Sequence, residues 1–114
     1  MRMWLVLPKF LCRKHLLGEH VEMHMIYGAL KKNFDKSLKG LSDKKFINAS
    51  LTKSRHDELA KELVARGYKH NSHMNDLPNN HANFKSNINY VESVYELVRR
   101  CPECKKRIFQ NIFG

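Results

Sequence analysis

No stretch of this chain contains the roughly 20 consecutive apolar residues that a membrane-spanning helix needs. The apolar run at the N-terminus covers only Trp4 to Leu7 before Pro8 and Lys9 interrupt it, and it is too short for the core of a signal peptide. The chain has three cysteines, an odd number, and without a secretion signal they do not indicate a disulfide framework. We therefore expect a cytoplasmic protein without a membrane anchor.

Acidic residues are also scarce. The chain has 11 aspartates and glutamates against 21 lysines and arginines, which gives a formal net charge of +10 and an isoelectric point near 9.7. So strong a positive charge favours a polyanionic partner, and nucleic acid is the commonest one. A basic protein that is merely soluble, or one that associates with ribosomes, is the alternative. Hydrophobic residues make up 42% of the 114 positions, which is enough for one globular domain over residues 1–114.

The spacing of apolar residues predicts three helices. A second helix is expected over residues 51–66, before Gly67, and a third over residues 87–100,. The first helix, over residues 12–34, is the clearest. Its apolar residues recur at intervals of three and four: Leu16, Leu17, Val21, Met25, Ile26, Ala29 and Leu30.

The other segments are predicted to be irregular. Residues 1–11 are apolar and are expected to enter the core as an extended segment with a turn at Pro8. Residues 35–50 are assigned to a basic loop, and residues 69–86, rich in Asn, His and Ser, to a long polar loop,. The predicted fold class is therefore all-α, a compact single domain of about three helices with an extended N-terminal segment. Three tyrosines at helix edges are assigned to the core: Tyr68, Tyr90 and Tyr95.

The N-terminal amine is a candidate nucleophile. Its reference pKa is about 7.7–8.0, against about 10.4 for lysine, so much more of it is unprotonated at neutral pH. The second residue, Arg2, is large, and a large second residue protects the initiator methionine from removal. We therefore expect Met1 to keep the terminal amine, which can be the amine of a Schiff-base site.

One face of the first predicted helix carries titratable side chains. His15, Glu19 and Glu22 lie at positions i, i+4 and i+7, so they share that face. A carboxylate on such a face can act as a general acid or base when its pKa is tuned. The alternative is an ordinary solvated helix face, and Glu19 is assigned a structural role.

Three segments carry a family resemblance: the N-terminal Met-Arg pair, the run HLLGEHVE at residues 15–22, and residues 55–68. Together they resemble the pyrimidine-dimer DNA glycosylases, the phage-type endonuclease V family, over roughly residues 1–70. The gap-free distance from Met1 to Glu22 matches the spacing between the nucleophilic terminus and the catalytic glutamate in that family.

The resemblance implies a DNA glycosylase with abasic-site lyase activity. The α-amine of Met1 would attack C1′ of the damaged nucleotide and form an imine, and Glu22 would assist this step and the β-elimination that follows. Arg2 and His15 match family positions that contact DNA. The implied substrate is double-stranded DNA with a damaged or modified base. It would be bound by a monomer that needs no metal or organic cofactor, in a bacterium or a phage-infected cell.

The chain departs from the family pattern at two positions of the first helix. Val21 and Met25 stand where the better-known dimer glycosylases carry DNA-contacting arginines. The aromatic C-terminal segment of the family also has no evident counterpart. The base that is removed therefore stays open between a pyrimidine dimer, an oxidised or alkylated base and a phage-type modified base. A non-catalytic DNA-binding protein on the same scaffold is the alternative function.

Other basic residues are expected to contact phosphates. Residues 99–107 hold five cations in nine positions, and binding through them would weaken steeply with salt. The alternative for this run is a solvated helix end, where arginines are favourable to the helix dipole. The residues assigned to the DNA backbone, besides Arg2 and His15, are Arg13, Lys14, Arg99, Arg100, Lys105 and Lys106.

Two pairs of residues suggest a zinc-stapled version of the non-catalytic alternative. His20 and His24 lie four residues apart on one helix, and Cys101 and Cys104 form a Cys-x-x-Cys pair,. Together they would supply a His2Cys2 site, although a single Cys-x-x-Cys pair is weak evidence. Three further histidines are assigned to a flexible polar loop: His70, His73 and His81.

Overall fold

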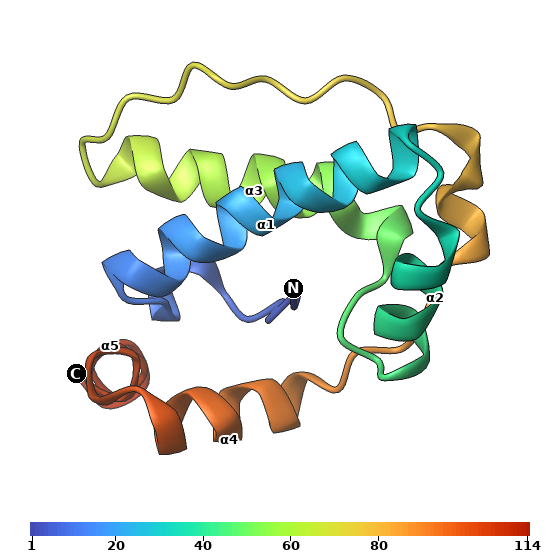
Figure 1. Ribbon diagram of the computed structural model, residues 1–114. Helices are drawn as coiled ribbons and strands as arrows, with labels where there is room; N and C mark the ends of the chain where they lie inside the picture. The colour runs from blue at the N-terminus through green and yellow to red at the C-terminus, as the bar shows by residue number, and fades with distance from the viewer.

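All residues, 1–114, are described by the structure, a computed structural model with five α-helices, three short 3-10 turns and no β-strand (Figure 1). Helices α1 (Arg13–Lys31) and α3 (Thr52–Ala65) pack against each other at the centre of the molecule. Helices α2 (Asp35–Asp43), α4 (Tyr90–Arg100) and α5 (Pro102–Phe113) lie around this pair. No helix is long and apolar enough to cross a membrane.

The all-α class and the three predicted helices are confirmed as α1, α3 and α4, but the expected number of about three was wrong. Helix α2 lies in the segment that was assigned to a basic loop. It has little buried apolar surface, because only Leu38 among its side chains is both apolar and fully buried. The helix is supported on its outer face by an ion pair of 3.2 Å between Lys39 Nζ and Asp43 Oδ2, one turn apart,.

Helix α5 was missed because Pro102 was taken only as a stop signal. It ends α4 and also opens α5, since proline fits the first turn of a helix, where its missing N–H is not needed,. Cys101 is the N-cap, and its Sγ accepts from the N–H of Cys104 at 3.4 Å. Cys104 and Ile108 then bury one face of α5 against the core.

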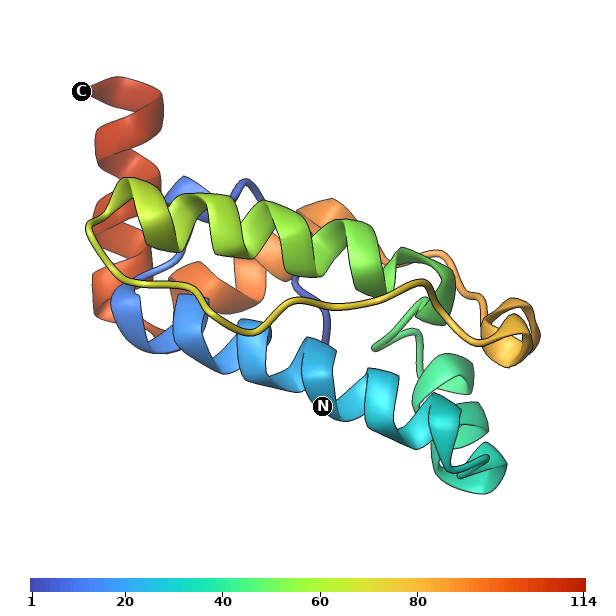
Figure 2. The same ribbon diagram turned by 90° about the horizontal axis from the view of Figure 1, so that it is seen from above.

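The first seven residues, which are extended except at Leu5 (φ 55°), run between the α1–α3 pair and α4 (Figure 1, Figure 2). Met3 and Val6 are fully buried, and the N–H of Met3 donates to the carbonyl of Phe46 at 2.8 Å. The 3-10 turn η1 (Pro8–Phe10) then leads into α1. The prediction of a buried, extended N-terminal segment with a turn at Pro8 is confirmed.

Between α3 and α4 the chain has no regular structure except the 3-10 turn η3 (Asn79–Asn83). The stretch before η3 runs along the outer side of α1 and α3 (Figure 2), where Met74 is buried. The predicted long loop is thus confirmed, and it is packed onto the helices. A further 3-10 turn, η2 (Ala49–Leu51), leads into α3.

The buried face of α4 differs from the prediction. Its fully buried residues are Ser93 and Leu97, whereas Tyr95 is 63% exposed and Tyr90, at its first position, is 44% exposed. The core assignment of these two tyrosines was therefore wrong, while Tyr68 is half-buried against the core. The helix has only one packed side, so much of its apolar surface faces solvent.

A buried ion pair joins α1 to α3. Arg55 and Glu19 are both about 1% exposed, and the Nε and Nη2 of Arg55 donate to the two carboxylate oxygens of Glu19 at 2.6 and 2.9 Å. The Nη1 of Arg55 also donates to the carbonyl of Val6 at 2.8 Å. The pair therefore fixes the N-terminal segment as well as the two central helices, as the structural role expected for Glu19 requires.

Replacing one member of this pair is expected to destabilise the protein strongly. In Arg55→Met the Glu19 carboxylate stays buried without a partner, which lowers the free energy of unfolding by about 3–5 kcal/mol. The double variant Glu19→Leu/Arg55→Met is expected to recover most of that loss, because both charges are then removed. Urea denaturation measures both variants, and a loss below about 1 kcal/mol in Arg55→Met would contradict the prediction.

Candidate active site and DNA-binding clefts

The N-terminal segment meets α1 at Glu22. The backbone N–H of Arg2 donates to Glu22 Oε2 at 3.2 Å, and Glu22 is half-buried. This contact holds the carboxylate one residue away from the α-amine of Met1. Met1 is itself half-buried and packs against the core. The structure thus places Glu22 against the backbone of the residue that follows Met1, and the chemistry predicted for Met1 and Glu22 stays a prediction.

Two features fix this arrangement. The hydrogen bond from Met3 to Phe46 anchors the segment behind the terminus. The guanidinium of Arg2 stacks on two aromatic rings, with its Cζ 4.2 Å from the centroid of Trp4 and 5.2 Å from that of Phe46. A cation held over aromatic faces in this way is oriented as well as attracted. The N-terminal residues are therefore ordered before any ligand binds.

Arg2 also lines a cleft of about 410 Å³ between the N-terminal segment, the end of α2 and α4, here called the Arg2 cleft. Burial and the neighbouring Arg100 lower the pKa of Arg2, against the opposing effect of acidic residues on α4. The cleft has four cationic residues that an anion can meet: Arg2, Lys44, Lys45 and Arg100. Of these, Lys44 and Lys45 were not predicted as site residues, because they were placed in a loop far from the terminus in sequence.

The two arginines at the end of α4 share one acidic partner. Glu96 Oε2 lies 2.9 Å from Arg99 Nη2 and 2.7 Å from Arg100 Nε. Only Arg100 lines the Arg2 cleft. Of this pair, Arg100 is therefore the residue placed to contact a ligand at the N-terminus.

A second basic cleft, of about 820 Å³, lies between the start of α1 and α5 and is here called the α1–α5 cleft. Its cations are the predicted Arg13, Lys14 and Lys106, together with Arg107. Lys105 is outside the cleft, with its Nζ 5.8 Å from the ring centroid of Phe109. Five of the cations predicted from the sequence thus line one of two separate clefts, whereas Arg99 and Lys105 line neither.

His15 lines neither of the two clefts. Its ring packs edge-on against Trp4, with the centroids 5.9 Å apart, and its Nδ1 faces the sulfurs of Cys12 and Cys104 at 3.3 and 3.5 Å. Burial lowers the pKa of His15, as does Lys14, while Glu22 opposes them. The contact with DNA that was predicted for His15 stays a prediction.

Val21 and Met25, the residues that stand in place of arginines, are exposed on α1 at 54% and 52%. Met25 is three residues beyond Glu22 and so lies beside it on the helix surface. The surface next to the carboxylate therefore includes exposed apolar side chains.

The proposed His2Cys2 combination of the sequence analysis is corrected by the structure. His20 and His24 gather with His56 and His70, whereas Cys101 and Cys104 gather with Cys12 and His15. Burial and the three neighbouring histidines lower the pKa of His20 to about 4, so its ring is neutral at neutral pH. His70 was assigned to a flexible loop, but it lies in this group, its Nε2 3.1 Å from His20 Nε2. The two residues of each pair do lie together, but the two pairs belong to different clusters and do not form one site.

Comparison with known proteins identifies the N-terminal two-thirds of the chain. A family model described as pyrimidine dimer DNA glycosylase matches residues 1–76 of the 114. The match includes Met1, Arg2, His15 and Glu22, and it ends before α4 and α5. No curated protein and no solved structure matches the chain significantly.

Proposed function

This chain belongs to the pyrimidine dimer DNA glycosylase family, and we propose that it removes a damaged or modified base from double-stranded DNA through its N-terminal α-amine. The family assignment indicates a DNA repair glycosylase. The finer proposal is that base removal is coupled to cleavage of the strand by β-elimination, without a metal or organic cofactor in any step. The protein is proposed to act as a monomer.

The contact between the N-terminal segment and Glu22 carries this proposal. A carboxylate 3.2 Å from the Arg2 N–H lies within reach of a sugar that the Met1 amine attacks. Amine and acid–base group must be held together in this way for Schiff-base chemistry on a deoxyribose, because proton transfers accompany each step. Trp4 and Phe46 support the same geometry through Arg2.

The proposed reaction balances without a co-reactant other than water. The amine nitrogen forms a bond to C1′ while the glycosidic C–N bond breaks. The electron pair of the glycosidic bond leaves with the base, and the base then takes up a proton. The sugar ring then opens and gives a protonated imine. Glu22 accepts the C2′ proton, the C3′–O bond breaks, and the 3′ phosphate leaves. Water finally hydrolyses the imine and frees the amine.

Glu22 has two tasks in this sequence. As an anion it stabilises the positive charge that develops on the sugar during base loss, and as a base it removes the C2′ proton. Glu19 has neither task, because Arg55 holds both of its oxygens in the core. Two glutamates three residues apart on one helix thus have separate functions.

The two basic clefts are proposed to hold the DNA backbone on either side of the lesion. Arg2 and Arg100 would contact phosphates next to the reacting sugar, and the α1–α5 cleft would contact the strand further away. The apolar surface of Val21 and Met25 beside Glu22 would face the altered nucleotide. The proposal therefore leaves the identity of the base to experiment and places its recognition on this surface.

Loss of single cations in the α1–α5 cleft is expected to weaken binding through salt-dependent contacts. Lys106→Ala should lower duplex affinity at every sequence and reduce the slope of log K against log salt by about one. Fluorescence anisotropy over a salt series measures this slope. Lys36→Ala, an exposed lysine on α2 outside both clefts, is the matched control, and an equal change in that variant would contradict a specific cleft.

Borohydride trapping on a duplex with one abasic site tests the proposed function. The abasic site makes the unknown base irrelevant, so the experiment asks only whether the protein forms an imine. We expect a covalent adduct that maps to the Met1 peptide. An adduct that maps to a lysine would show that this lysine, and not Met1, is the nucleophile. Tight binding without any adduct would refute the enzyme proposal.

The absence of arginines at positions 21 and 25 favours a second candidate, a DNA-binding protein on the same scaffold without the reaction. It predicts salt-sensitive binding to duplex DNA and no strand scission at any lesion. The trapping experiment separates the two candidates, since only the enzyme forms an adduct.

A further inference from the structure

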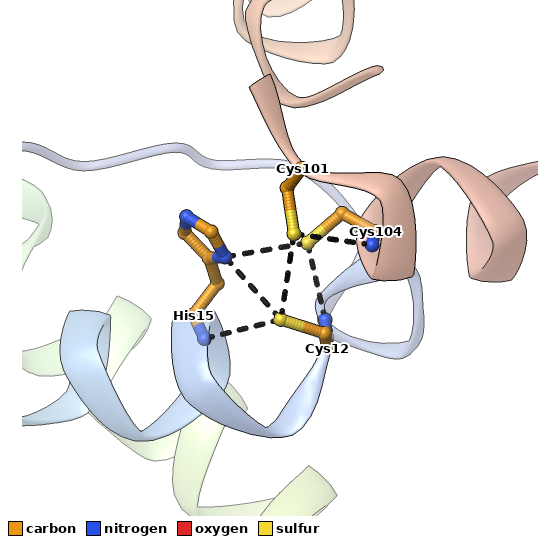
Figure 3. Close-up of side chains that lie close together, drawn as sticks. All are labelled: Cys12, His15, Cys101 and Cys104. Atoms are coloured by element: carbon orange, nitrogen blue, oxygen red, sulfur yellow. Dashed lines mark hydrogen bonds between the residues drawn. The ribbon is translucent and has the colours of Figure 1, made fainter. Parts of the chain in front are cut away.

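Three cysteines and one histidine converge where α1 begins and where α4 meets α5. Cys12 and His15 come from the start of α1, and Cys101 and Cys104 come from the start of α5 (Figure 3). The three sulfurs and the Nδ1 of His15 point toward one another, and all four atoms lie within 4.8 Å of one another. No step of the proposed reaction uses this group.

The distances fit a tetrahedral zinc ion. With Zn–S bonds of about 2.3 Å and a Zn–N bond of about 2.0–2.1 Å, tetrahedral geometry places two sulfurs about 3.8 Å apart and a sulfur and a nitrogen about 3.5 Å apart. Cys12 Sγ and Cys101 Sγ are 3.8 Å apart. His15 Nδ1 is 3.3 Å from Cys12 Sγ and 3.5 Å from Cys104 Sγ.

The sequence spacing and the surrounding hydrogen bonds point the same way. Both pairs, Cys12-x-x-His15 and Cys101-x-x-Cys104, have the short spacing of zinc ligands,. Backbone N–H groups donate to the sulfurs, among them that of Cys12 to Cys104 Sγ at 3.2 Å. Cys12 and Cys101 are also the N-caps of their helices, so the helix starts fix the positions of both sulfurs.

A disulfide does not explain this group. All three cysteines are free, and the 3.8 Å between Cys12 Sγ and Cys101 Sγ is far above the roughly 2.05 Å of an S–S bond. A disulfide would also leave one cysteine and the histidine without a role. We propose that one structural zinc ion is bound here by four side chains: Cys12, His15, Cys101 and Cys104.

This zinc site would tie the two ends of the chain together. Cys12 and Cys104 are 92 residues apart, and Cys12 and Glu103 line the α1–α5 cleft. The ion would therefore fix the distance between the two walls of that cleft. Four protein ligands leave no open position, so the ion is structural. If no zinc binds here, the reaction proposed for Met1 and Glu22 is unaffected, because that reaction needs no metal.

Cobalt substitution tests the site on the whole, untagged protein. Stoichiometric Co²⁺ added to metal-free protein should give an intense thiolate-to-cobalt absorption band, which Zn²⁺ then removes. Cys104→Ala should lose this band and one equivalent of zinc, whereas His81→Asn, whose Nδ1 contacts Ser50 Oγ outside the group, should keep both. If Cys104→Ala does not fold, the titration of the unaltered protein decides alone. Thiols that react with Ellman's reagent equally fast with and without zinc would overturn the proposal.

A second group, independent of the first, consists of four histidines between α1, α3 and the loop that covers them. His20 and His24 lie on α1, His56 on α3 and His70 in the loop, and one ring nitrogen of each lies within 4.8 Å of the others. His24 Nε2 is buried without any hydrogen-bond partner. His20 Nε2 and His70 Nε2 are 3.1 Å apart, so one of these two nitrogens can donate to the other or both can face a shared ion.

Such a cluster is costly without an ion, because a buried polar atom without a partner destabilises the fold. A metal ion gives His24 Nε2 the partner that it lacks. His56 has the second contact typical of a metal-bound histidine, since its Nδ1 lies 2.9 Å from the carboxylate of Asp57,. Its Nε2, which is 3.1 Å from the carbonyl of Ser72, would have to leave that carbonyl to bind the ion. Four imidazoles suit a borderline divalent ion. The geometry points to a second zinc-type site formed by His20, His24, His56 and His70.

Metal analysis of matched variants tests this second site. The unaltered protein should carry two zinc ions per chain, and His70→Asn should carry one and keep the thiolate-to-cobalt band. His70 lies in the loop, so its replacement leaves the helix packing intact. Cobalt in the histidine site should add only weak visible bands. Zinc content that is unchanged in His70→Asn would overturn the second site without affecting the first.

Discussion

Acetylation of the Met1 amine is expected to abolish imine trapping and strand cleavage, by more than about 10³-fold, while duplex binding changes little. The proposed nucleophile is intramolecular and positioned, and effective molarities of about 10⁵ M or more are typical of such groups. Lysines cannot substitute for it easily, because more than 99% of a lysine with its reference pKa of about 10.4 is protonated at neutral pH. Borohydride trapping and cleavage of an abasic duplex measure the effect.

A protein with one extra glycine before Met1 is the sharper control, because it keeps a free amine. One added residue moves the amine by up to about 3.5 Å, away from the Glu22 carboxylate that the Arg2 N–H contacts at 3.2 Å. We expect a large loss in this variant as well. Full activity in the glycine-extended protein would refute the proposed positioning, and full activity in the acetylated protein would refute the nucleophile.

Replacement of Glu22 by glutamine is expected to slow cleavage by about 10²–10⁴-fold, the usual contribution of a general acid–base group. The amide oxygen can still accept the N–H of Arg2, so the N-terminal segment should keep its place and DNA affinity should change little. The loss should be largest in the β-elimination step, which needs the base. Single-turnover kinetics on an abasic duplex separates imine formation from elimination.

Glu92→Gln is the matched control for this variant. Glu92 lies on α4 and lines the Arg2 cleft, so its neutralisation changes the local charge by the same amount. We expect it to retain activity and to bind DNA slightly more tightly. A Glu22→Gln protein within threefold of the unaltered protein would show that neither the charge of Glu22 nor a proton transfer to it is needed, and an equal loss in both variants would show that charge and not a proton transfer is involved.

The helices that the sequence predicts well are those with a wide apolar face. The apolar spacing in α1 predicts the helix, although its buried face includes Met23 and leaves Val21 and Met25 of the predicted stripe exposed. Helix α2 has little apolar surface, and α5 begins at a proline, so local patterns hide both. Their helical state depends on tertiary contacts, such as that of Ile108 in α5 with the core.

The candidate site, too, could be predicted from the sequence only in part. The spacing of Met1 and Glu22 was available from the resemblance, but the periodicity alone does not separate Glu22 from Glu19. Only the packed structure shows that Glu19 faces Arg55 and that Glu22 faces the N-terminus. The His-x-x-x-His and Cys-x-x-Cys pairs are visible in the sequence as short motifs, but the sequence does not show which other residues lie beside each pair. Which pair meets which depends on how α5 packs against the start of α1.

The molecule is a thin slab, 43 Å long, 30 Å wide and 16 Å thick. Along B-form DNA, with about 3.4 Å per base pair, its long axis of 43 Å covers about a dozen base pairs, little more than one turn. A glycosylase that bound DNA along this axis would need only a short gap between other bound proteins to reach a lesion. The same length also sets the shortest substrate: a duplex of about a dozen base pairs should be cleaved as well as a long one, and shorter duplexes progressively less.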